Sequence, residues 1–536
     1  MGLARSWSMS LHGLEGSLVE VEADVSSGLP AFVLIGLPDT ALIEARDRVR
    51  AAVVNSGEPW PPGRLTVSLS PASLHKRGSS FDLAMACAII AANGLLPVDA
   101  LHDVVLLGEL GLDGRIRAVR GVLPAVLAAA RSGMRRVVVP ALNRAEAALV
   151  PGVDVVAAPS LPHLIAALRG QLAGDELADA VEEAHRASRE ADVQSSADRG
   201  RSDASDARQP ADMSDVVGQH EARQAIEICA AGGHHLFLYG PPGVGKTMLA
   251  ERLPGLLPPL DRQAALEVTA IHSLAGALPP NQPLCSQRPF QHPHHTATVA
   301  AMVGGGSGLV RPGAASLAHH GVLFLDEAPE FSPTVLDALR QPLECGEVVI
   351  ARAKGIFSFP ARFQLVLAAN PCPCGLAGAA DVACTCTPTT RRRYLARLSG
   401  PLLDRVDLRV RLDRVGRGGV LIDGGSAEPT AVVASRVEQA RERTSWRLRD
   451  LPWQSNAEIP GPLLRTMLRP EPDALAILER PVTTGTLTAR GLDRVLRVAW
   501  TLADLAGRDR PNRGDTSTAL ALRSGAPQVA ESRAGR

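Results

Sequence analysis

The sequence predicts an α/β protein of several domains, and three observations support this fold class. The chain has 536 residues, which is more than one hydrophobic core usually organises. Short apolar runs of strand type alternate with helical stretches over residues 1–412, as is typical of α/β folds. Helical periodicity alone continues over 430–508, where Val495, Leu496 and Leu502 are among the apolar positions. We therefore expect two α/β domains followed by a helical domain.

Composition limits the classes of protein and partner. The formal net charge is zero, so any contact with nucleic acid must come from a local basic patch. The eight cysteines do not form the pattern of a secreted disulfide framework. The N-terminus lacks the apolar core of a signal peptide, and the longest apolar run, 83–98, is too short to span a bilayer. We expect a cytoplasmic protein that does not contact membranes.

The domain boundaries follow changes in composition along the chain. Strand and helix patterns fill the first domain, with strands expected near 65–69, 104–107 and 137–139 and helices over 81–92 and 122–130. A polar and charged linker follows; its first part can form a helix and its Ser/Asp/Arg part is expected to be disordered. The predicted segments are the first domain 1–168, the linker 169–212, a second α/β domain 213–412 with a cysteine cluster at 372–386, a Gly-rich linker 413–429, the helical domain 430–508 and a frayed polar tail 509–536.

The clearest chemical signal is a glycine-rich loop between a strand and a helix. An apolar strand over 235–239 precedes the loop, and helical residues follow from Met248. In this setting, backbone N–H groups and the helix N-terminus bind phosphate, a lysine reaches the β and γ phosphates, and a hydroxyl coordinates Mg²⁺. The predicted ATP-binding residues are Gly240, Pro241, Pro242, Gly243, Val244, Gly245, Lys246 and Thr247, with Thr247 also on Mg²⁺. The combined strand, spacing and helix favour a phosphate loop over a chance Gly/Pro turn.

Two further apolar strands end in residues suited to hydrolysis. The strand over 322–325 precedes Asp326 and Glu327, and the strand over 364–369 precedes Asn370. Residues that follow parallel strands lie at the ligand-binding edge of a sheet. We predict that Asp326 holds Mg²⁺, Glu327 activates the attacking water and Asn370 orients that water. Each residue alone could be a solvated strand end or a turn residue, but their order after the phosphate loop favours hydrolysis.

Two arginines are candidates for contacts with the transferred phosphate. Arg405, supplied by a neighbouring subunit, could neutralise the charge that develops on the phosphoryl group. Arg490 begins a helix of the C-terminal domain and could reach the same phosphate from a lid. In an arginine-rich chain, a surface salt bridge explains either residue as well.

The chain resembles the YifB/ComM-type magnesium-chelatase-like AAA+ ATPases from about residue 11 to residue 508. The motifs that carry the resemblance include Gly36-Leu37-Pro38-Asp39, Lys76-Arg77-Gly78-Ser79-Ser80-Phe81-Asp82-Leu83, Pro293-His294-His295-Thr296, Asn370-Pro371-Cys372-Pro373-Cys374-Gly375 and Ser399-Gly400-Pro401-Leu402-Leu403-Asp404-Arg405. The resemblance implies an N-terminal Lon-protease-like (ribosomal S5 domain 2-like) α/β domain, a central P-loop AAA+ doubly wound parallel sheet and a C-terminal helical lid.

The same resemblance implies roles, partners and an activity. Asn370 would be sensor 1, Arg405 the trans-acting arginine finger and Arg490 the sensor 2 arginine. The assembly would be a hexameric ring. ComM-type members are DNA helicases that promote branch migration during natural transformation, which implies ATP-driven translocation on DNA. A protein-remodelling or chelatase-type motor would share every hydrolytic residue and stays open as the alternative.

An ATP-dependent protease is the less favoured alternative. By resemblance to the Lon-type fold, Ser80 lies where the nucleophile would be, but Ala125 occupies the position of the catalytic lysine. A serine without a nearby base is a poor nucleophile. We therefore expect the first domain to be a non-catalytic relative.

DNA contact is predicted at a hairpin over 347–359, whose turn contains Ala353-Lys354-Gly355. By resemblance to MCM-like motors, this hairpin would line the pore, with Arg352 and Lys354 facing DNA phosphates. A solvent-exposed hairpin with basic residues explains the pattern equally well. We expect His294, His295 and His319 to have polar structural roles or to contact DNA or nucleotide.

Four cysteines close to Asn370 form two Cys-x-Cys pairs, Cys372 with Cys374 and Cys384 with Cys386. Residues i and i+2 of an extended segment face the same way, so two such pairs can close a tetrahedral Zn²⁺ site. Four reduced thiols in a loop are the alternative. The predicted ion would hold the loop beside Asn370 and would not take part in chemistry.

Overall fold

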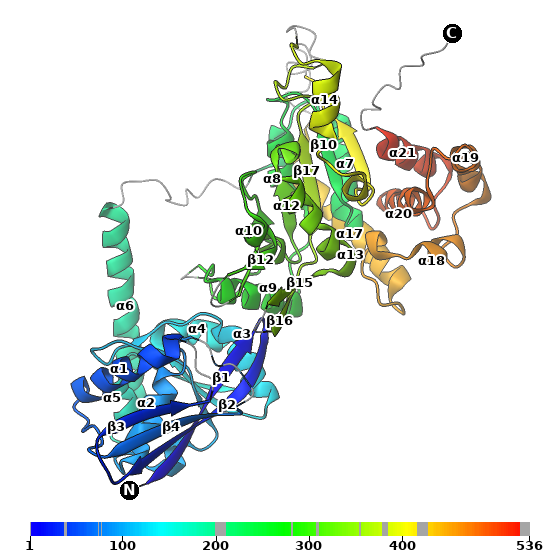
Figure 1. The fold of residues 1–536 in the computed structure, drawn as a ribbon. Coiled ribbons are helices and arrows are strands. Elements are labelled where there is room, and N and C mark those ends of the chain that lie inside the picture. Colours follow the sequence, from blue (N-terminus) through cyan, green and yellow to red (C-terminus); the bar gives the residue numbers. More distant parts are fainter. Residues whose placement is uncertain are drawn as a thin grey trace.

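The computed structural model contains an N-terminal α/β domain, a central α/β motor domain and a C-terminal helical domain that packs beside the motor (Figure 1). It describes residues 2–36, 40–72, 74, 76, 78–198, 211–279, 282–306, 310–352, 355–377, 384–414 and 427–525. No helix within these residues is both long enough and apolar enough to cross a membrane.

The N-terminal domain is built on a mixed sheet, which has seven strands among the described residues, in the order β3-β4-β2-β1-β5-β8-β9. β1 and β2 form a long antiparallel hairpin, whereas β5, β8 and β9 run parallel. The strands are β1 Leu3–His12, β2 Glu15–Ser26, β3 Ala31–Ile35, β4 Arg64–Ser70, β5 Val104–Leu106, β8 Arg136–Pro140 and β9 Asp154–Ala158, with a small ribbon of β6 Glu109–Leu110 and β7 Ile116–Arg117. Val19, Val21 and Ala23 on β2 are buried while Glu20 and Glu22 between them point outward, because side chains alternate along a strand.

Helices cover this sheet. They are α1 Thr40–Asn55, α2 Asp82–Ala92, α3 Val122–Arg131, α4 Arg144–Ala147, α5 Leu161–Leu168 and α6 Gly174–Asp198. α2 is buried along its whole length because its residues are almost all small or apolar. The predicted linker is therefore helical over its first part, where Val181 is buried against the domain, while residues 199–210 lie outside the described residues.

The motor domain is built on a parallel sheet of five strands within the described residues, in the order β11-β14-β17-β10-β18. Its strands are β10 Leu236–Tyr239, β11 Phe290–Gln291, β14 Val322–Leu325, β17 Gln364–Ala369 and β18 Leu408–Arg411. Both faces are covered: Leu236 and Leu238 pack with α7 and α8, whereas Phe237 and Tyr239 pack in a second cluster on the other face. This explains why the strands are continuous apolar runs in the sequence.

The other motor elements connect these strands. They are α7 His220–Gly232, α8 Lys246–Leu256, α9 Arg262–Ala275, α10 Val299–Val303, α11 Ala314–Leu317, α12 Pro333–Ala338, α13 Arg340–Cys345, α14 Pro388–Leu395 and α15 Gly400–Leu403, with ribbons β12 Gly304–Gly305 to β13 Arg311–Pro312 and β15 Glu347–Arg352 to β16 Gly355–Pro360. α9 joins the two α/β domains, because its Ala270 packs with apolar residues of the N-terminal domain and the N–H of Gly121 donates to Ser273 O.

The helical domain extends beyond its predicted end at residue 508. It consists of α17 Thr430–Leu448, α18 Gly461–Arg465, α19 Pro472–Thr483, α20 Ala489–Leu505 and α21 Arg513–Ser524. The prediction of a frayed tail from residue 509 is wrong over α21, which buries Ala519 and Leu522 against α19, α20 and β18. The overlooked signal is a capping box, in which Asn512 and Asp515 exchange side-chain and backbone hydrogen bonds. Most of the predicted Gly-rich linker, 415–426, lies outside the described residues.

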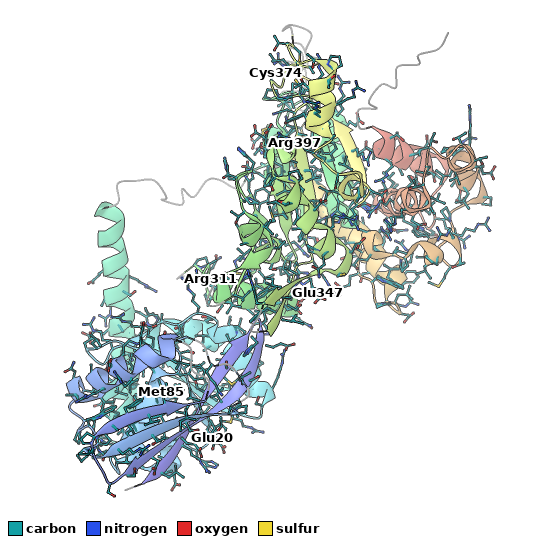
Figure 2. The ribbon with its side chains drawn as sticks, viewed as in Figure 1. Glu20, Met85, Arg311, Glu347, Cys374 and Arg397 are labelled. Atoms are coloured by element: carbon teal, nitrogen blue, oxygen red, sulfur yellow. The ribbon has the colours of Figure 1, made fainter. Side chains whose placement is uncertain are left out.

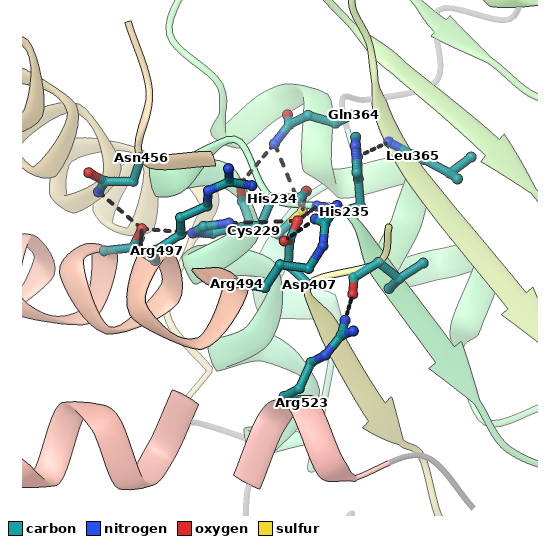
Figure 3. A network of polar contacts seen from close by, with 12 residues as sticks. Cys229, His234, His235, Gln364, Leu365, Asp407, Asn456, Arg494, Arg497 and Arg523 are labelled. Atoms are coloured by element: carbon teal, nitrogen blue, oxygen red, sulfur yellow. Dashed lines mark hydrogen bonds and ion pairs between the residues drawn. The ribbon is translucent and has the colours of Figure 1, made fainter. Parts of the chain in front are cut away.

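A buried polar network joins the motor sheet to the helical domain (Figure 3). Asp407, just before β18, accepts a hydrogen bond from the His235 N–H (2.8 Å) and pairs with Arg494 of α20 (2.6 Å). His234 Nε2 lies 2.8 Å from Thr501 Oγ1 of the same helix. Burial by itself would raise the pKa of Asp407, but Arg494, His234 and His235 hold that pKa well below its usual range. The buried carboxylate is therefore charged and depends on Arg494.

Replacing Arg494 by methionine should loosen the helical domain. The change leaves a buried carboxylate without its partner, which typically costs about 3–5 kcal/mol. Calorimetry of the full chain should show a lower melting temperature for Arg494→Met, whereas Arg480→Met, at an exposed position of α19, should melt like the wild type. Equal melting temperatures for the two variants would contradict the role given to the pair.

Acid should weaken the same contact in the wild type. The pKa of Asp407 is lower in the folded than in the unfolded chain, so its stabilising effect is fully present above the ordinary aspartate pKa of about 4. The effect is lost as the pH falls through the lowered value. The gap in melting temperature between wild type and Arg494→Met should therefore narrow in acid.

Candidate active site

Three neighbouring strands of the motor sheet end at the same edge. β10 and β17 pair in parallel, with Tyr239 opposite Ala369, and β14 pairs with β17, with Leu325 opposite Leu367. The residues that follow these strands are the loop 240–247, Asp326 and Asn370. Segments far apart in the sequence thus meet at the carboxyl edge of the sheet, where α/β folds bind ligands.

Hydrogen bonds link the predicted site residues at this edge. Lys246 Nζ donates to Asn370 Oδ1 (2.9 Å) and to the backbone oxygens of Gly240 (2.7 Å) and Pro241 (2.9 Å). Thr247 Oγ1 donates to Asp326 Oδ2 (2.6 Å). The structure therefore brings the phosphate loop, the acidic pair and the strand-ending asparagine together.

The loop backbone has the conformation that phosphate binding needs. Gly243 and Gly245 adopt positive φ angles of 78° and 92°, which side chains rarely tolerate, and Gly245 lies at the N-terminus of α8. Gly240 allows a close approach, because a Cβ there would lie 2.3 Å from Leu412 O. Val244 is nearly buried and anchors the loop in the core.

Lys246 supplies positive charge that is not paired directly with a carboxylate among the described residues. Within the described part of the chain, Lys246 forms no ion pair, and its hydrogen-bond partners are two carbonyls and an amide. Burial lowers the pKa of Lys246, and the nearby Asp326 and Glu327 oppose this. A cation of this kind at the N-terminus of α8 suits an anionic phosphate. The Thr247 hydroxyl and the Asp326 carboxylate form an oxygen pair that suits Mg²⁺.

Glu327 occupies a strained position next to Asp326. Its φ is 50°, in the left-handed region, and its N–H donates to Asp326 Oδ1 (2.8 Å). Such a conformation costs on the order of 1–3 kcal/mol and is common at functional sites. The carboxylate is half exposed, and its Oε2 lies 3.6 Å from His295 Nδ1. The sequence had left the role of His295 open, and the structure places it beside this acid.

Arg405 and Arg490 lie at the opposite edge of the sheet. Arg405 precedes β18, whose Leu408 pairs with Leu236 at the start of β10. A four-residue strand spans about 13 Å, so neither arginine meets the loop 240–247 of its own chain. Arg405 is buried and pairs with Glu344, while Arg490 is 77% exposed and lies 3.9 Å from Asp404. The structure places both arginines near Asp404. It does not bring them to the site residues at the carboxyl edge, which are Lys246, Thr247, Asp326 and Asn370.

Comparison with known proteins gives the family. Three family models match in series: subunit ChlI of Mg-chelatase over residues 21–143, magnesium chelatase, subunit ChlI over 212–419, and the ChlI C-terminal model over 427–523. The chain belongs to the magnesium chelatase ChlI-like AAA+ ATPases. The family implies ATP and Mg²⁺ as cofactors, and the geometry of the loop 240–247, Thr247 and Asp326 fits both.

Full-length relatives place the chain in the YifB/ComM branch of this family. The chain is 52% identical to protein Rv2897c of Mycobacterium tuberculosis over 98% of this chain and 99% of the relative. It is 40% identical to YifB of Escherichia coli (96% and 95%) and 39% identical to the competence protein ComM of Haemophilus influenzae (98% and 98%). A shorter similarity, 30% over 143 residues, links it to Lon protease 2 of Thermus thermophilus, in keeping with a Lon-like N-terminal domain.

The N-terminal domain of this ATPase has a cavity at the Lon-like position. The cavity is about 370 Å³ and includes Ser80, Ala125, Glu109 and Arg120 in its lining. Ser79, next to Ser80, donates to Glu109. The described lining of this cavity contains neither lysine nor histidine, so it offers Ser80 no base of that kind.

The hairpin predicted for DNA contact is present as β15 and β16. Arg352 pairs with Gly355 across the turn and is exposed, whereas Lys354 lies outside the described residues. Phe357 is buried and stacks on His12 of the N-terminal domain, with ring centroids 6.1 Å apart. The predicted hairpin is thus confirmed, whereas its contact with DNA stays a prediction.

His319 has the polar structural role that the sequence favoured. Its Nδ1 accepts a hydrogen bond from the Arg362 N–H (3.0 Å), and its Nε2 lies 3.4 Å from Glu267 Oε2. His320 adds a second contact to the same carboxylate (3.2 Å). No motif points to Glu267, which lies more than fifty residues away on α9.

The four cysteines of the predicted cluster converge beside the candidate active site. Cys372 Sγ lies 3.3 Å from Cys374 Sγ and 3.6 Å from Cys384 Sγ, and Cys374 lies 3.5 Å from Cys384. With Cys386, all four sulfur atoms lie within 4.8 Å of one another. Hydrogen bonds from Leu376 N–H and the Cys372 thiol lower the pKa of Cys374 to about 6. The cluster lies at the end of the motor remote from the N-terminal domain (Figure 2).

Two substitutions should separate ATP binding from hydrolysis. Lys246→Ala removes the cation at the phosphate loop and should weaken ATP binding about tenfold or more. Glu327→Gln keeps the shape but removes the base, so the variant should bind ATP normally and turn it over about 10²–10⁴-fold more slowly. Binding of a fluorescent ATP analogue and phosphate release measure the two effects.

Glu330→Gln is the matched control for the second change. Glu330 lies three residues further on and pairs with Arg397 (3.2 Å). We expect this variant to hydrolyse ATP at nearly the wild-type rate. Ordinary turnover by Glu327→Gln would remove the assignment of Glu327 as the base.

Proposed function

We propose that this ATPase is a ring-shaped DNA translocase, in which ATP hydrolysis drives branch migration during recombination or the uptake of DNA. The meeting of Lys246, Thr247, Asp326 and Asn370 at one sheet edge supports the hydrolytic half of the proposal. The competence protein ComM, similar over nearly the whole chain, supports the link to DNA.

The residues of the site suggest a division of labour in hydrolysis. The loop 240–247 would hold ATP, and Thr247 and Asp326 would hold Mg²⁺, which neutralises phosphate charge when bound. Asn370, fixed by Lys246, orients the attacking water as sensor 1. The Glu327 carboxylate accepts a proton from that water, and His295 holds this carboxylate in place.

The arrangement of the arginines supports an assembly of several copies. Arg405 and Arg490 lie near Asp404 at the amino edge of the sheet, remote from the phosphate loop of their own chain. In a head-to-tail ring, that edge can face the carboxyl edge of the next copy. Arg405 then serves as a finger and Arg490 as the sensor 2 arginine of the helical lid, both acting on a neighbour's phosphate. The family resemblance suggests six copies.

Two inactive variants should therefore restore each other's activity. Arg405→Ala keeps an intact Glu327, and Glu327→Gln keeps an intact Arg405. In a 1:1 mixture, half of the sites lie on an Arg405→Ala copy and half of those face a Glu327→Gln copy, so about a quarter of wild-type turnover should return. Phosphate release from the mixture measures this.

A control pair keeps the complementation test clear. Glu327→Gln mixed with Lys246→Ala should stay far less active if Lys246 and Glu327 serve the same site. Because Arg405 is buried, Arg490→Ala, at an exposed position, provides a second partner for the mixture. Mixtures that stay as inactive as either variant alone would indicate that the arginines act within one chain.

DNA should stimulate ATP turnover through the hairpin of β15 and β16. Lys354→Ala and Arg352→Ala remove cations that can contact DNA phosphates, so each should reduce the stimulation by forked or four-way DNA. Basal turnover should persist, and added salt should weaken the stimulation in the wild type. Arg469→Ala, an exposed arginine of the helical domain, is the matched control.

A chelatase-type or protein-remodelling motor is the second candidate, favoured by the family models themselves. It shares every hydrolytic residue, so DNA stimulation decides between the two. If DNA does not change turnover in the wild type, nor in Lys354→Ala, Arg352→Ala and Arg469→Ala, the second candidate is favoured. Peptide cleavage is disfavoured because the cavity around Ser80 offers no lysine or histidine base among its described residues.

A further inference from the structure

We propose that Cys372, Cys374, Cys384 and Cys386 bind one structural Zn²⁺ ion that holds the loop after Asn370 against the phosphate loop. The proposal that the ion binds depends only on the arrangement of the four cysteines. Its effect on ATP turnover rests on the proposed nucleotide site, and the experiments below measure the two separately.

The spacing of the sulfur atoms suits a single tetrahedral ion. A Zn–S distance of about 2.3 Å places tetrahedral sulfur ligands about 3.8 Å apart. The Sγ separations are 3.3, 3.5 and 3.6 Å, and all four sulfur atoms lie within 4.8 Å of one another. These separations are far longer than a disulfide bond of about 2.0 Å, and all four cysteines are free. Four thiolates in this arrangement favour zinc over harder cations.

The two halves of the cluster come from segments with different anchors. Cys372 is buried two residues after Asn370, and Gly375 N–H donates to Cys372 O (2.9 Å) in a tight turn. Gly375 has a φ of 75°, and a Cβ there would lie 2.7 Å from Pro242 Cδ. This half of the cluster therefore lies directly against the phosphate loop.

The other half leads into α14 and on to the acidic strand end. Thr387 caps α14 immediately after Cys386, accepting a hydrogen bond from Thr390 N–H (3.2 Å). Beyond the helix, Arg397 donates to Pro329 O (3.1 Å) and pairs with Glu330 (3.2 Å), just after Glu327. An ion at the cysteines would thus connect the phosphate loop side to the Glu327 side of the active site.

Metal content tests the site directly. The full chain, purified with reductant and dialysed against a weak chelator, should contain one Zn²⁺ per chain by mass spectrometry of the metal. Cys374→Ser and Cys386→Ser should each lose most of it, whereas Cys345→Ser, an exposed cysteine outside the cluster, should keep it. Replacement by Co²⁺ should give the visible absorption of tetrahedral thiolate coordination, which the two cluster variants should lack.

ATP turnover tests the role of the ion. Removing zinc with a strong chelator, followed by excess Mg²⁺, should lower turnover about tenfold or more, and added Zn²⁺ should restore it. The inactive Glu327→Gln variant should still contain zinc, which separates this proposal from that of the nucleotide site. Three results would overturn the zinc site. They are a wild type without zinc, equal zinc contents in the wild type, Cys374→Ser and Cys386→Ser, and the absorption of an iron–sulfur cluster. Full turnover without zinc would overturn the role.

Discussion

Parallel hydrogen bonding between β10, β14 and β17 is the constraint on which the active site depends. Because these strands run in the same direction and in register, Gly240, Asp326 and Asn370 must emerge at one edge of the sheet. Apolar residues cover both faces and fix that register, so a small slip would separate Thr247 from Asp326. The contacts of Lys246 with Asn370 and of Thr247 with Asp326 are consequences of this alignment and not of local sequence.

The same strand direction separates the phosphate loop from the two arginines that we propose act on phosphate. Residues that precede β18, including Arg405, are placed at the amino edge, beside Arg490 of the helical domain. The buried pair of Asp407 and Arg494 fixes the helical domain to that edge. A chain built this way has a phosphate-binding edge and an arginine edge that face apart. In the proposed ring, complete sites would form only where one copy meets the next, and hydrolysis would then be sensitive to movement between copies.

The sequence predicted most of this architecture because its signals are local. The apolar runs at 322–325 and 364–369 coincide with β14 and β17, and the helices over 81–92 and 122–130 match α2 and α3 within one residue. Apart from the capping box of α21, which is a local signal, the parts that it missed depend on contacts between distant residues. His295 reaches Glu327, and α21 is held by burial against β18 rather than by apolar character along its length. The positions of Arg405 and Arg490 relative to the phosphate loop follow from sheet order, which spacing in the chain does not reveal.

A double-mutant cycle on Thr247 and Asp326 tests most directly whether the phosphate loop and the acidic strand end form one site. Phosphate release gives kcat/KM for wild type, Thr247→Val, Asp326→Asn and the double variant. Two residues that act on one metal lose their effect together, so the double variant should be about as slow as the slower single variant. If the two losses instead multiply, the residues act independently, and the site derived from the strand ends is wrong.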